Sequence, residues 1–257
     1  MSRTLALFGL GVAWIFGLTT PTGGHAQGAD AVRPSFEVVS IKENRTMRNG
    51  GGDRISPGRL TIENQNVMHV IREAYNVKDF QISGAPAWAG EDNYDIVAKA
   101  TYAASFGQME VMLQSLLADR FQLKCHRVQA ELKGCSLVVG KNGPKFHEYR
   151  ELKDDDARKT GVLMGRGLLR GRKSDMEYLA IHISNALDVP VIDRTGLKGL
   201  YEISLEYFTD GKLPDDTDIR PESLPAAIET QLGLKLVAQK IPVELLVIDH
   251  MERPTEN

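Results

Sequence analysis

The sequence predicts an α+β protein made of two tandem, divergent repeats, each a small mixed or antiparallel sheet with two helices on one face. Three observations carry this prediction. Four segments have apolar residues at helical spacing, segments with strand-like alternation follow each of them, and the resulting order of elements is written twice along the chain. A length of 257 residues allows one or two such domains.

Each of the four helical segments places its apolar residues three and four positions apart, on one face. The stripes are Val67, Val70, Ile71 and Ala74; Met109, Met112, Leu113, Leu116 and Leu117; Met176, Leu179, Ala180 and Ile183; and Ala227 with Ile228 inside the fourth segment, 224–232. Polar residues ahead of the stripes are typical of helix starts. These candidate caps are Asn66 or Asn64, Ser105 with Gln108, Ser174 with Glu177, and Ser223, while Gly233 is placed to end the last helix.

Two strand-like segments follow each helix, so the pattern helix, strand, strand occurs four times. The expected strands are 80–83 and 94–100; 121–128 and 135–139; 189–192 and 201–207; and 234–239 and 243–248. Because the strands are short and the helices lie outside the sheet, the pattern favours the α+β class.

A divergent internal duplication explains this order. Corresponding positions are Tyr94-Asp95-Ile96 and Tyr201-Glu202-Ile203, 107 residues apart; Phe121-Gln122-Leu123 and Leu234-Lys235-Leu236, 113 apart; and Leu60 after Gly58, as Leu169 after Gly167. The expected organisation is a signal peptide at 1–26, an N-terminal strand and Gly-rich loop at 27–58, a first repeat at 59–139, a linker at 140–167 and a second repeat at 168–257.

The first residues have the order of an export signal: Arg3, an unbroken apolar run from Leu5 to Leu18, and then a Pro- and Gly-containing break. This run of about 14 residues is shorter than the roughly 20 residues of a membrane-spanning helix. We therefore expect cleavage after Ala26, with Ala31 as the second choice and an uncleaved membrane anchor as the alternative. The prediction is a periplasmic or secreted protein with no stable membrane span after cleavage.

The charge of the chain is mildly acidic. Removing residues 1–26 takes away one charge, that of Arg3, so the formal net charge changes from −3 to −4. Nucleic-acid binding usually requires basic residues clustered on one surface. Here the basic residues are interleaved with acidic ones. We therefore expect no nucleic-acid partner.

Two cysteines, Cys125 and Cys135, fall on the apolar faces of two neighbouring strand candidates. If these strands pair as a hairpin centred near Ala130, the two thiols can meet, and an exported protein would retain the disulfide. The alternative is that both are small buried hydrophobic residues. The sequence does not distinguish the two.

The mature chain resembles a family of exported proteins of unknown function that is expanded in soil-dwelling acidobacteria. The resemblance spans about 36–257 and rests on Phe36–Lys42, Tyr94–Lys99, Leu116–Phe121, Val191–Leu197, Val247–His250 and Glu252–Pro254. It implies no activity.

A second, looser resemblance concerns topology. The order helix, strand, turn at Asp193–Gly199, strand, helix, strand, strand is similar to the small periplasmic modules at the N-termini of secretins and of TonB-dependent signalling receptors. Those modules bind other proteins, so the resemblance implies protein binding as the function of each half.

The sequence contains no recognisable motif for nucleophilic catalysis. No Gly-x-Ser-x-Gly elbow occurs, and neither Ser56 before Pro57 nor Ser83 before Gly84 has the flanking glycines. The apolar setting expected for both cysteines disfavours a reactive thiolate. We therefore expect no catalytic residue.

Metal and phosphate sites are disfavoured by spacing. The five histidines of the mature chain are His69, His126, His147, His182 and His250, and no two have the spacing of a helical zinc motif. We interpret His69 and His182 as solvated, because they fall outside the apolar stripes. His250 and Glu252 alternate and are a weak zinc candidate. The glycines Gly165, Gly167 and Gly171 are interpreted as a turn, and the aspartates at 154–156, 210, 215, 216 and 218 as solvated loops.

Asp193-Arg194-Thr195-Gly196 is the segment most like a motif, and we interpret it as a strand connection in which Gly196 takes a positive φ rather than as a recognition turn. With no catalytic residue, cofactor or metal expected, the leading hypothesis is a non-enzymatic protein-interaction or signalling module of the cell envelope. It would engage a protein partner through a sheet edge or a groove between the halves. The alternatives are a hydrolase acting on envelope or environmental polymers and a small-molecule carrier with a closed apolar cavity.

Overall fold

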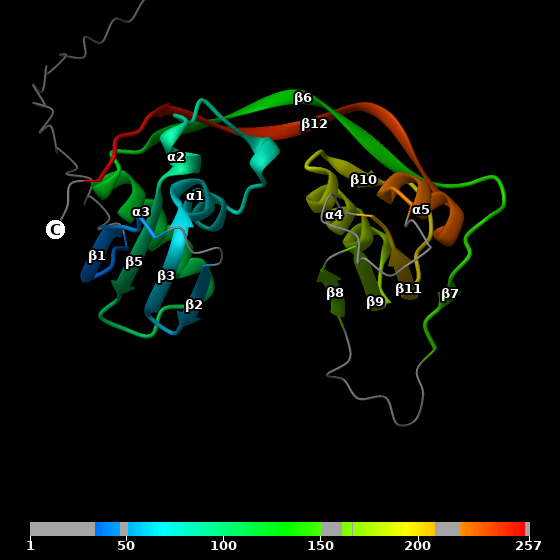
Figure 1. Ribbon diagram of the computed structural model, residues 1–257, viewed down its shortest axis with the longest axis horizontal. Helices are drawn as coiled ribbons and strands as arrows, with labels where there is room; N and C mark the ends of the chain where they lie inside the picture. The colour runs from blue at the N-terminus through cyan, green and yellow to red at the C-terminus, as the bar shows by residue number, and fades with distance from the viewer. Residues whose placement is uncertain (1–33, 47–50, 151–160, 166, 209–221, 255–257) are drawn as a thin grey trace, which may run out of the picture. The chain divides into compact units, whose positions relative to one another are not determined.

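The computed structural model describes residues 34–46, 51–150, 161–165, 167–208 and 222–254 (Figure 1). The expected signal peptide lies outside these residues. The elements of the first half are β1 (Val38–Glu43), β2 (Gly52–Ser56), β3 (Arg59–Asn66), α1 (Val67–Tyr75), η1 (Asp79–Gln81), β4 (Ile82–Ser83), α2 (Trp88–Glu91), β5 (Asn93–Lys99), α3 (Phe106–Arg120) and β6 (Lys124–Val139). Those of the second half are β7 (His147–Glu148), β8 (Gly161–Gly165), β9 (Leu168–Ser174), α4 (Met176–Leu187), β10 (Val191–Asp193), β11 (Tyr201–Glu206), α5 (Leu224–Leu232) and β12 (Leu234–His250). The α+β class is confirmed.

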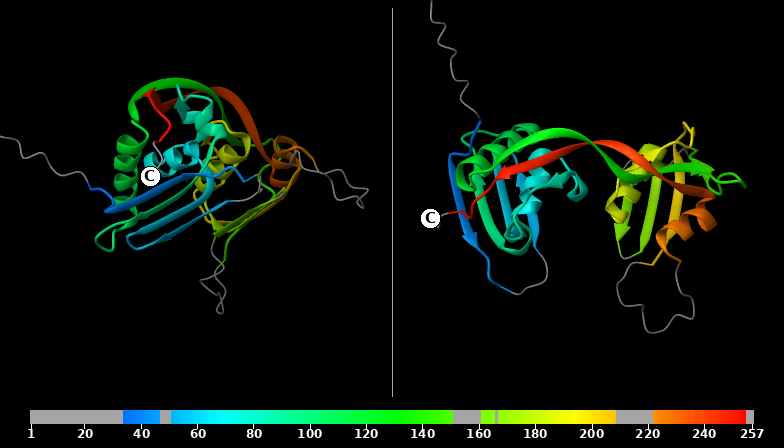
Figure 2. Two further views of the ribbon diagram at one scale, coloured as in Figure 1. Left: turned by 60° about the vertical axis from the view of Figure 1, so that its left-hand side comes forward. Right: turned by 90° about the horizontal axis from the view of Figure 1, so that it is seen from above.

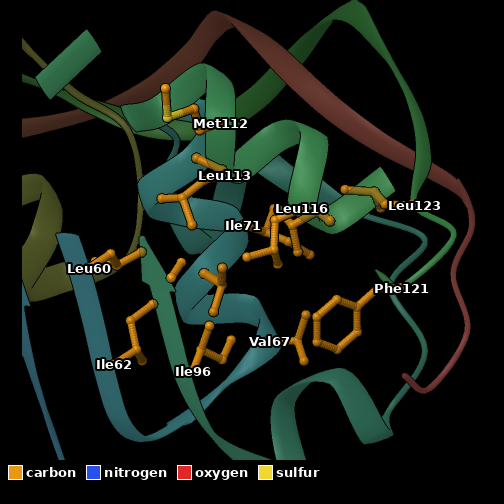
Figure 3. Close-up of a cluster of buried hydrophobic side chains, with 14 of the residues drawn as sticks. Leu60, Ile62, Val67, Ile71, Ile96, Met112, Leu113, Leu116, Phe121 and Leu123 are labelled. Atoms are coloured by element: carbon orange, nitrogen blue, oxygen red, sulfur yellow. The ribbon is translucent and has the colours of Figure 1, made fainter. Parts of the chain in front are cut away.

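The first core lies between one sheet and two helices. The sheet has the strand order β1-β5-β3-β2 and is antiparallel throughout. Along β5 the side chains of Tyr94, Ile96 and Ala98 are buried, whereas Val97 between the last two and Lys99 after them are exposed. The buried face is covered by α1 and α3 (Figure 1), and residues of both helices meet those of the sheet in one interior (Figure 3).

The second core is built in the same way. Its sheet has the order β7-β11-β9-β8, again antiparallel, and α4 and α5 supply the helical side. Adding six to each strand number of the first sheet reproduces this order. The local backbone geometry also corresponds in the two halves. Helices α1 and α4 are each preceded, two residues before the N-cap, by a residue with positive φ, and each ends in a left-handed C-cap; these residues are Asn64 and Asn76 for α1, and Lys173 and Asp188 for α4. A glycine with positive φ, Gly58 or Gly167, precedes β3 and β9. The duplication itself stays a prediction. The correspondence of the two sheets includes β1, β2, β7 and β8, which lie outside the expected repeat boundaries.

The third sheet joins the two halves of the chain. Its order is β10-β6-β12-β4, with β6 and β12 antiparallel over their whole length, from Leu234↔Val139 to His250↔Lys124 (Figure 2). The outer strands β10 and β4 are parallel to their neighbours. This pair of long strands contributes to both cores, with Leu246 and Ile248 in the first and Leu137 and Leu234 in the second.

The hairpin centred near Ala130, one of the two alternatives for the cysteines, does not form, because 124–128 and 135–139 belong to one continuous strand, β6. The alternation simply continues: Val128, Ala130 and Leu132 are half-buried, and the residues between them are exposed. Cys125 and Cys135 are therefore ten residues apart along one strand, about 33 Å at roughly 3.3 Å per residue. Both are free thiols, and no bridge joins them in this structure.

The four expected helices form, and their caps explain where they begin. Asn66 accepts a hydrogen bond from the His69 amide at 2.9 Å, and Ser105 with Gln108 forms the predicted capping box of α3. Gly233 ends α5 in a left-handed conformation. The expected cap at Ser174 is wrong: Asp175 caps α4 by accepting from the Tyr178 amide at 2.7 Å, and Ser174 is buried one position earlier.

Candidate functional site

The most distinctive exposed feature of the described residues is the edge of the first sheet formed by β2. All five residues of β2 are exposed, and the strand pairs with β3 on one side only. A two-residue turn at Pro57-Gly58 joins the two strands, so the flanking pair Ser56↔Arg59 is a hydrogen-bonded pair. Since such pairs alternate along an antiparallel ladder, the peptide groups of Asp53 and Ile55 face away from β3.

An apolar groove lies beside this edge, on the helical side of the sheet. It is lined by Asp53, Ile55, Leu60, Ile62, Glu73, Phe106, Met109, Glu110 and Leu113. Leu60, Ile62 and Leu113 form its floor, because they belong to the buried core (Figure 3). Ile55 and Phe106 are 47% and 59% exposed, so both present apolar surface to solvent beside the groove. We call this feature the β2 groove.

The two β2 residues whose peptide groups face outward are the same two whose side chains line the β2 groove. A segment that pairs with the edge would therefore also place alternate side chains over the groove. Edge and groove thus form one continuous surface.

Asp53 ties β2 to the helical layer. Its Oδ2 lies 2.5 Å from Nε2 of His69 on α1, and both side chains are about four-fifths buried, although Asp53 as a whole residue is exposed. The other ring nitrogen of His69, Nδ1, lies 3.3 Å from the guanidinium of Arg72, which also pairs with Asp79. The expectation that His69 is solvated is therefore wrong, because β2 folds over it.

The charge around the β2 groove is acidic. Glu73 and Glu110 line it, are half-buried, and form no ion pair within the described part of the chain. Arg72, which is paired with Asp79, and Lys78 line a neighbouring pocket together with Glu73 and Glu110. The carboxylates of the groove are thus available to a positively charged group.

A second polar cluster, at the end of the first sheet, has a structural role. Oδ1 of Asp95 accepts from Nδ2 of Asn44 and from the amide of Asn64, each at 2.9 Å. Asn64 has a φ of 52° and sits at the irregularity between Ile62 and Gln65 in the pairing of β3 with β5. The Asp95 carboxylate therefore holds the bend that leads β3 into α1.

The remaining histidines do not come together. His126 contacts Asp249 at 2.8 Å, His250 contacts Glu252 at 2.9 Å, and all four side chains are exposed. The predicted common side of His250 and Glu252 is confirmed as a single pair. Among the described residues, no group of three or more His, Cys, Asp or Glu side chains is arranged to hold a metal ion.

His182 is not solvated as expected. Both ring nitrogens are buried without a hydrogen-bond partner among the described residues. The His182 ring packs edge-on against the Tyr178 ring, with 4.4 Å between the ring centroids. Burial lowers the pKa of His182, and the positive charge of Lys78 adds to this effect.

The segment Asp193–Gly196 is a strand connection, as predicted. Oδ1 of Asp193 accepts from the amide and the hydroxyl of Thr195, both at 2.8 Å, and Gly196 has a φ of 73°. Its polar side chains are engaged in forming the turn.

The β2 groove could not be predicted because the second part of 27–58, where β2 lies, was expected to be a Gly-rich loop. One signal was present: Pro57-Gly58 is a turn dipeptide, and it is flanked by Arg54-Ile55-Ser56 and Arg59-Leu60-Thr61, each with an apolar residue between two polar ones. The same assignment error affects β8, which lies in the expected linker.

The fold and the site define an α+β protein whose two cores share one pair of long strands. The chain belongs to the family described as "Protein of unknown function (DUF3738)", whose model matches residues 68–251. No curated protein and no solved structure matches the chain. In the part of the chain that the structure describes, no helix is both long enough and apolar enough to cross a membrane.

Proposed function

We propose that this protein is a protein-interaction module of the cell envelope, which binds an extended segment of a partner along the free edge of β2. The observation that carries the proposal is the coincidence of edge and groove: Asp53 and Ile55 offer outward peptide groups and also line the β2 groove. Exposed edge strands are usually covered, shortened or charged to prevent such pairing. β2 is short and carries Asp53 and Arg54, but it also exposes Ile55, and Phe106 adds a second exposed apolar side chain beside the same groove.

Export is part of this proposal. It rests on the order of the N-terminal residues, with Arg3, the apolar run and the small residues before Ala26. The partner is accordingly a protein of the periplasm or of the outer surface.

The test is affinity purification of the tagged mature protein from its native envelope, with wild type compared with two proline variants. Ile55→Pro removes an outward amide of β2 without touching a pair that bonds to β3. Glu43→Pro is the matched control on the opposite edge: Glu43 is exposed, and since the Asn44 amide bonds to Asn93, the amide one position earlier faces away from β5.

We expect one dominant partner with wild type and Glu43→Pro, and its loss with Ile55→Pro when circular dichroism shows that both variants are folded. Equal recovery from both variants would refute the β2 edge as the binding site. Recovery of no partner by wild type, together with turnover of an envelope polymer by the purified protein, would favour the hydrolase alternative.

A further inference from the structure

The chemistry of the β2 groove identifies the kind of segment that fits it. We propose that the partner segment is an extended strand with an apolar side chain over the β2 groove and a lysine or arginine two positions away on the same side. This inference rests on the proposed function, because it names the partner class of the same site.

The apolar part of the motif follows from the lining. Ile55 and Phe106 stand exposed on either side of a floor of core residues, so an apolar side chain placed between them would contact the groove from both sides. Pairing with β2 sets this position, because a strand opposite Asp53 and Ile55 directs every second side chain to the helical side of the sheet.

The basic part of the motif follows from charge. Side chains two positions apart along a strand are about 7 Å apart, within reach of the groove carboxylates for a side chain as long as lysine or arginine. Glu73 and Glu110 are half-buried, so a cation that binds them loses less attraction to solvent screening than it would on an open surface. Asp53 contributes less, because His69 already contacts it at 2.5 Å.

An acidic segment is excluded by the same geometry. Its carboxylates would face Glu73, Glu110 and Asp53 across a partly desolvated groove, and such like-charge contacts oppose binding.

The experiment is selection from a library of random heptapeptides displayed on phage, with the purified mature protein as bait. Baits are wild type, Ile55→Pro, and the double variant Glu73→Lys/Glu110→Lys. The matched control is Glu177→Lys/Glu229→Lys, which makes the same change of charge at exposed positions on α4 and α5 of the second core.

We expect wild type and the Glu177/Glu229 variant to enrich peptides with an apolar residue and a basic residue two positions apart, and Ile55→Pro to enrich none. The Glu73/Glu110 variant should bind the selected peptides roughly tenfold more weakly and should enrich an acidic residue at the basic position. Binding of a selected peptide to wild type should weaken as salt rises.

Three results would overturn the inference, and they differ in what else they affect. Enrichment that is lost in Ile55→Pro but shows no basic preference would overturn the motif and leave the β2 edge as the binding site. Equal enrichment by wild type and Ile55→Pro would overturn the proposed function as well. A dimer in analytical ultracentrifugation that Ile55→Pro dissociates would show that a second copy of this chain occupies the edge.

Discussion

The Asp95 carboxylate accepts a hydrogen bond from the backbone amide of Asn64 at 2.9 Å, across two neighbouring strands of the first sheet. The same oxygen accepts from the Asn44 amide group. One side chain thus connects three strands or strand ends at the point where β3 bends into α1.

Replacing this carboxylate should destabilise the protein. Asp95→Ala removes the acceptor of two partly buried donors, and we expect the free energy of unfolding to fall by about 1–3 kcal/mol. Asp95→Asn is the matched control, because it keeps an oxygen at this position and should lose less. Urea denaturation measures both, and equal losses in the two variants would contradict the acceptor role.

The contact between β6 and β10 leaves no room for a side chain at Gly134. A Cβ atom there would lie 2.3 Å from the carbonyl oxygen of Pro190 and 2.8 Å from Cδ1 of Ile241. Gly134→Ala should therefore lower the free energy of unfolding by about 1–3 kcal/mol. Gly107→Ala in α3 is the control: it meets nothing within 4 Å, and it should raise stability by up to about 1 kcal/mol. Thermal or urea unfolding showing no loss for Gly134→Ala would refute the close approach of Pro190.

The free energy of unfolding should decrease as the pH is lowered, over a range set by the pKa of His182. Burial holds the pKa of His182 below its ordinary value in the folded protein, so the unfolded chain binds the proton more tightly. The free energy of unfolding should therefore decrease as pH falls below about 6.5, until the folded protein is protonated as well. His182→Phe keeps an aromatic ring against Tyr178 and should flatten this dependence between about pH 7 and 5. Replacing the exposed His147 by Gln should leave the dependence as in wild type, and an unchanged slope in His182→Phe would refute the prediction.

Both cysteines should be free thiols in the purified protein. They lie ten residues apart on β6, and burial raises the pKa of the Cys135 thiol. Because the thiolate is the reactive form, Cys135 should react with iodoacetamide at neutral pH only slowly until the protein is unfolded. Intact mass spectrometry after alkylation under denaturing, non-reducing conditions should show two labels per chain. A mass lower by two hydrogens, with no label, would establish the bridge that the structure lacks.

The helices could be predicted from the sequence because their determinants are local. The stripe around Met112 and the pair Ser105 and Gln108 lie within a few positions of one another, and so do Asn66 and His69. The α+β class followed from these helices and from the alternation between them. Even the error at α4 was of one residue, from Ser174 to Asp175.

The sheets could not be predicted in the same way, because their pairing depends on residues far apart. The residues next to Ala130 in the sequence do not indicate that Val243 is its partner in the neighbouring strand. An alternation of apolar and polar residues that continues through Ala130 is compatible with one long strand or with two short ones. The β2 groove was missed for a related reason: a short strand with one apolar residue, Ile55, becomes recognisable only when β3 pairs with it and α3 places Phe106 beside it. The site therefore depends on tertiary structure that no single segment encodes.

The pairing of β6 with β12 also governs the order in which the protein can fold. Leu246, Ile248 and Met251 complete a core whose other residues begin at Phe36, so the first half cannot close before almost the whole chain is present. Contacts of such high sequence separation slow folding and expose unpaired strands in the meantime. A chain that stalls or is cut before residue 234 would lack β12, so one edge of β6 would keep unpaired backbone N–H and C=O groups. We expect β6 of another such chain to pair with that edge in place of β12.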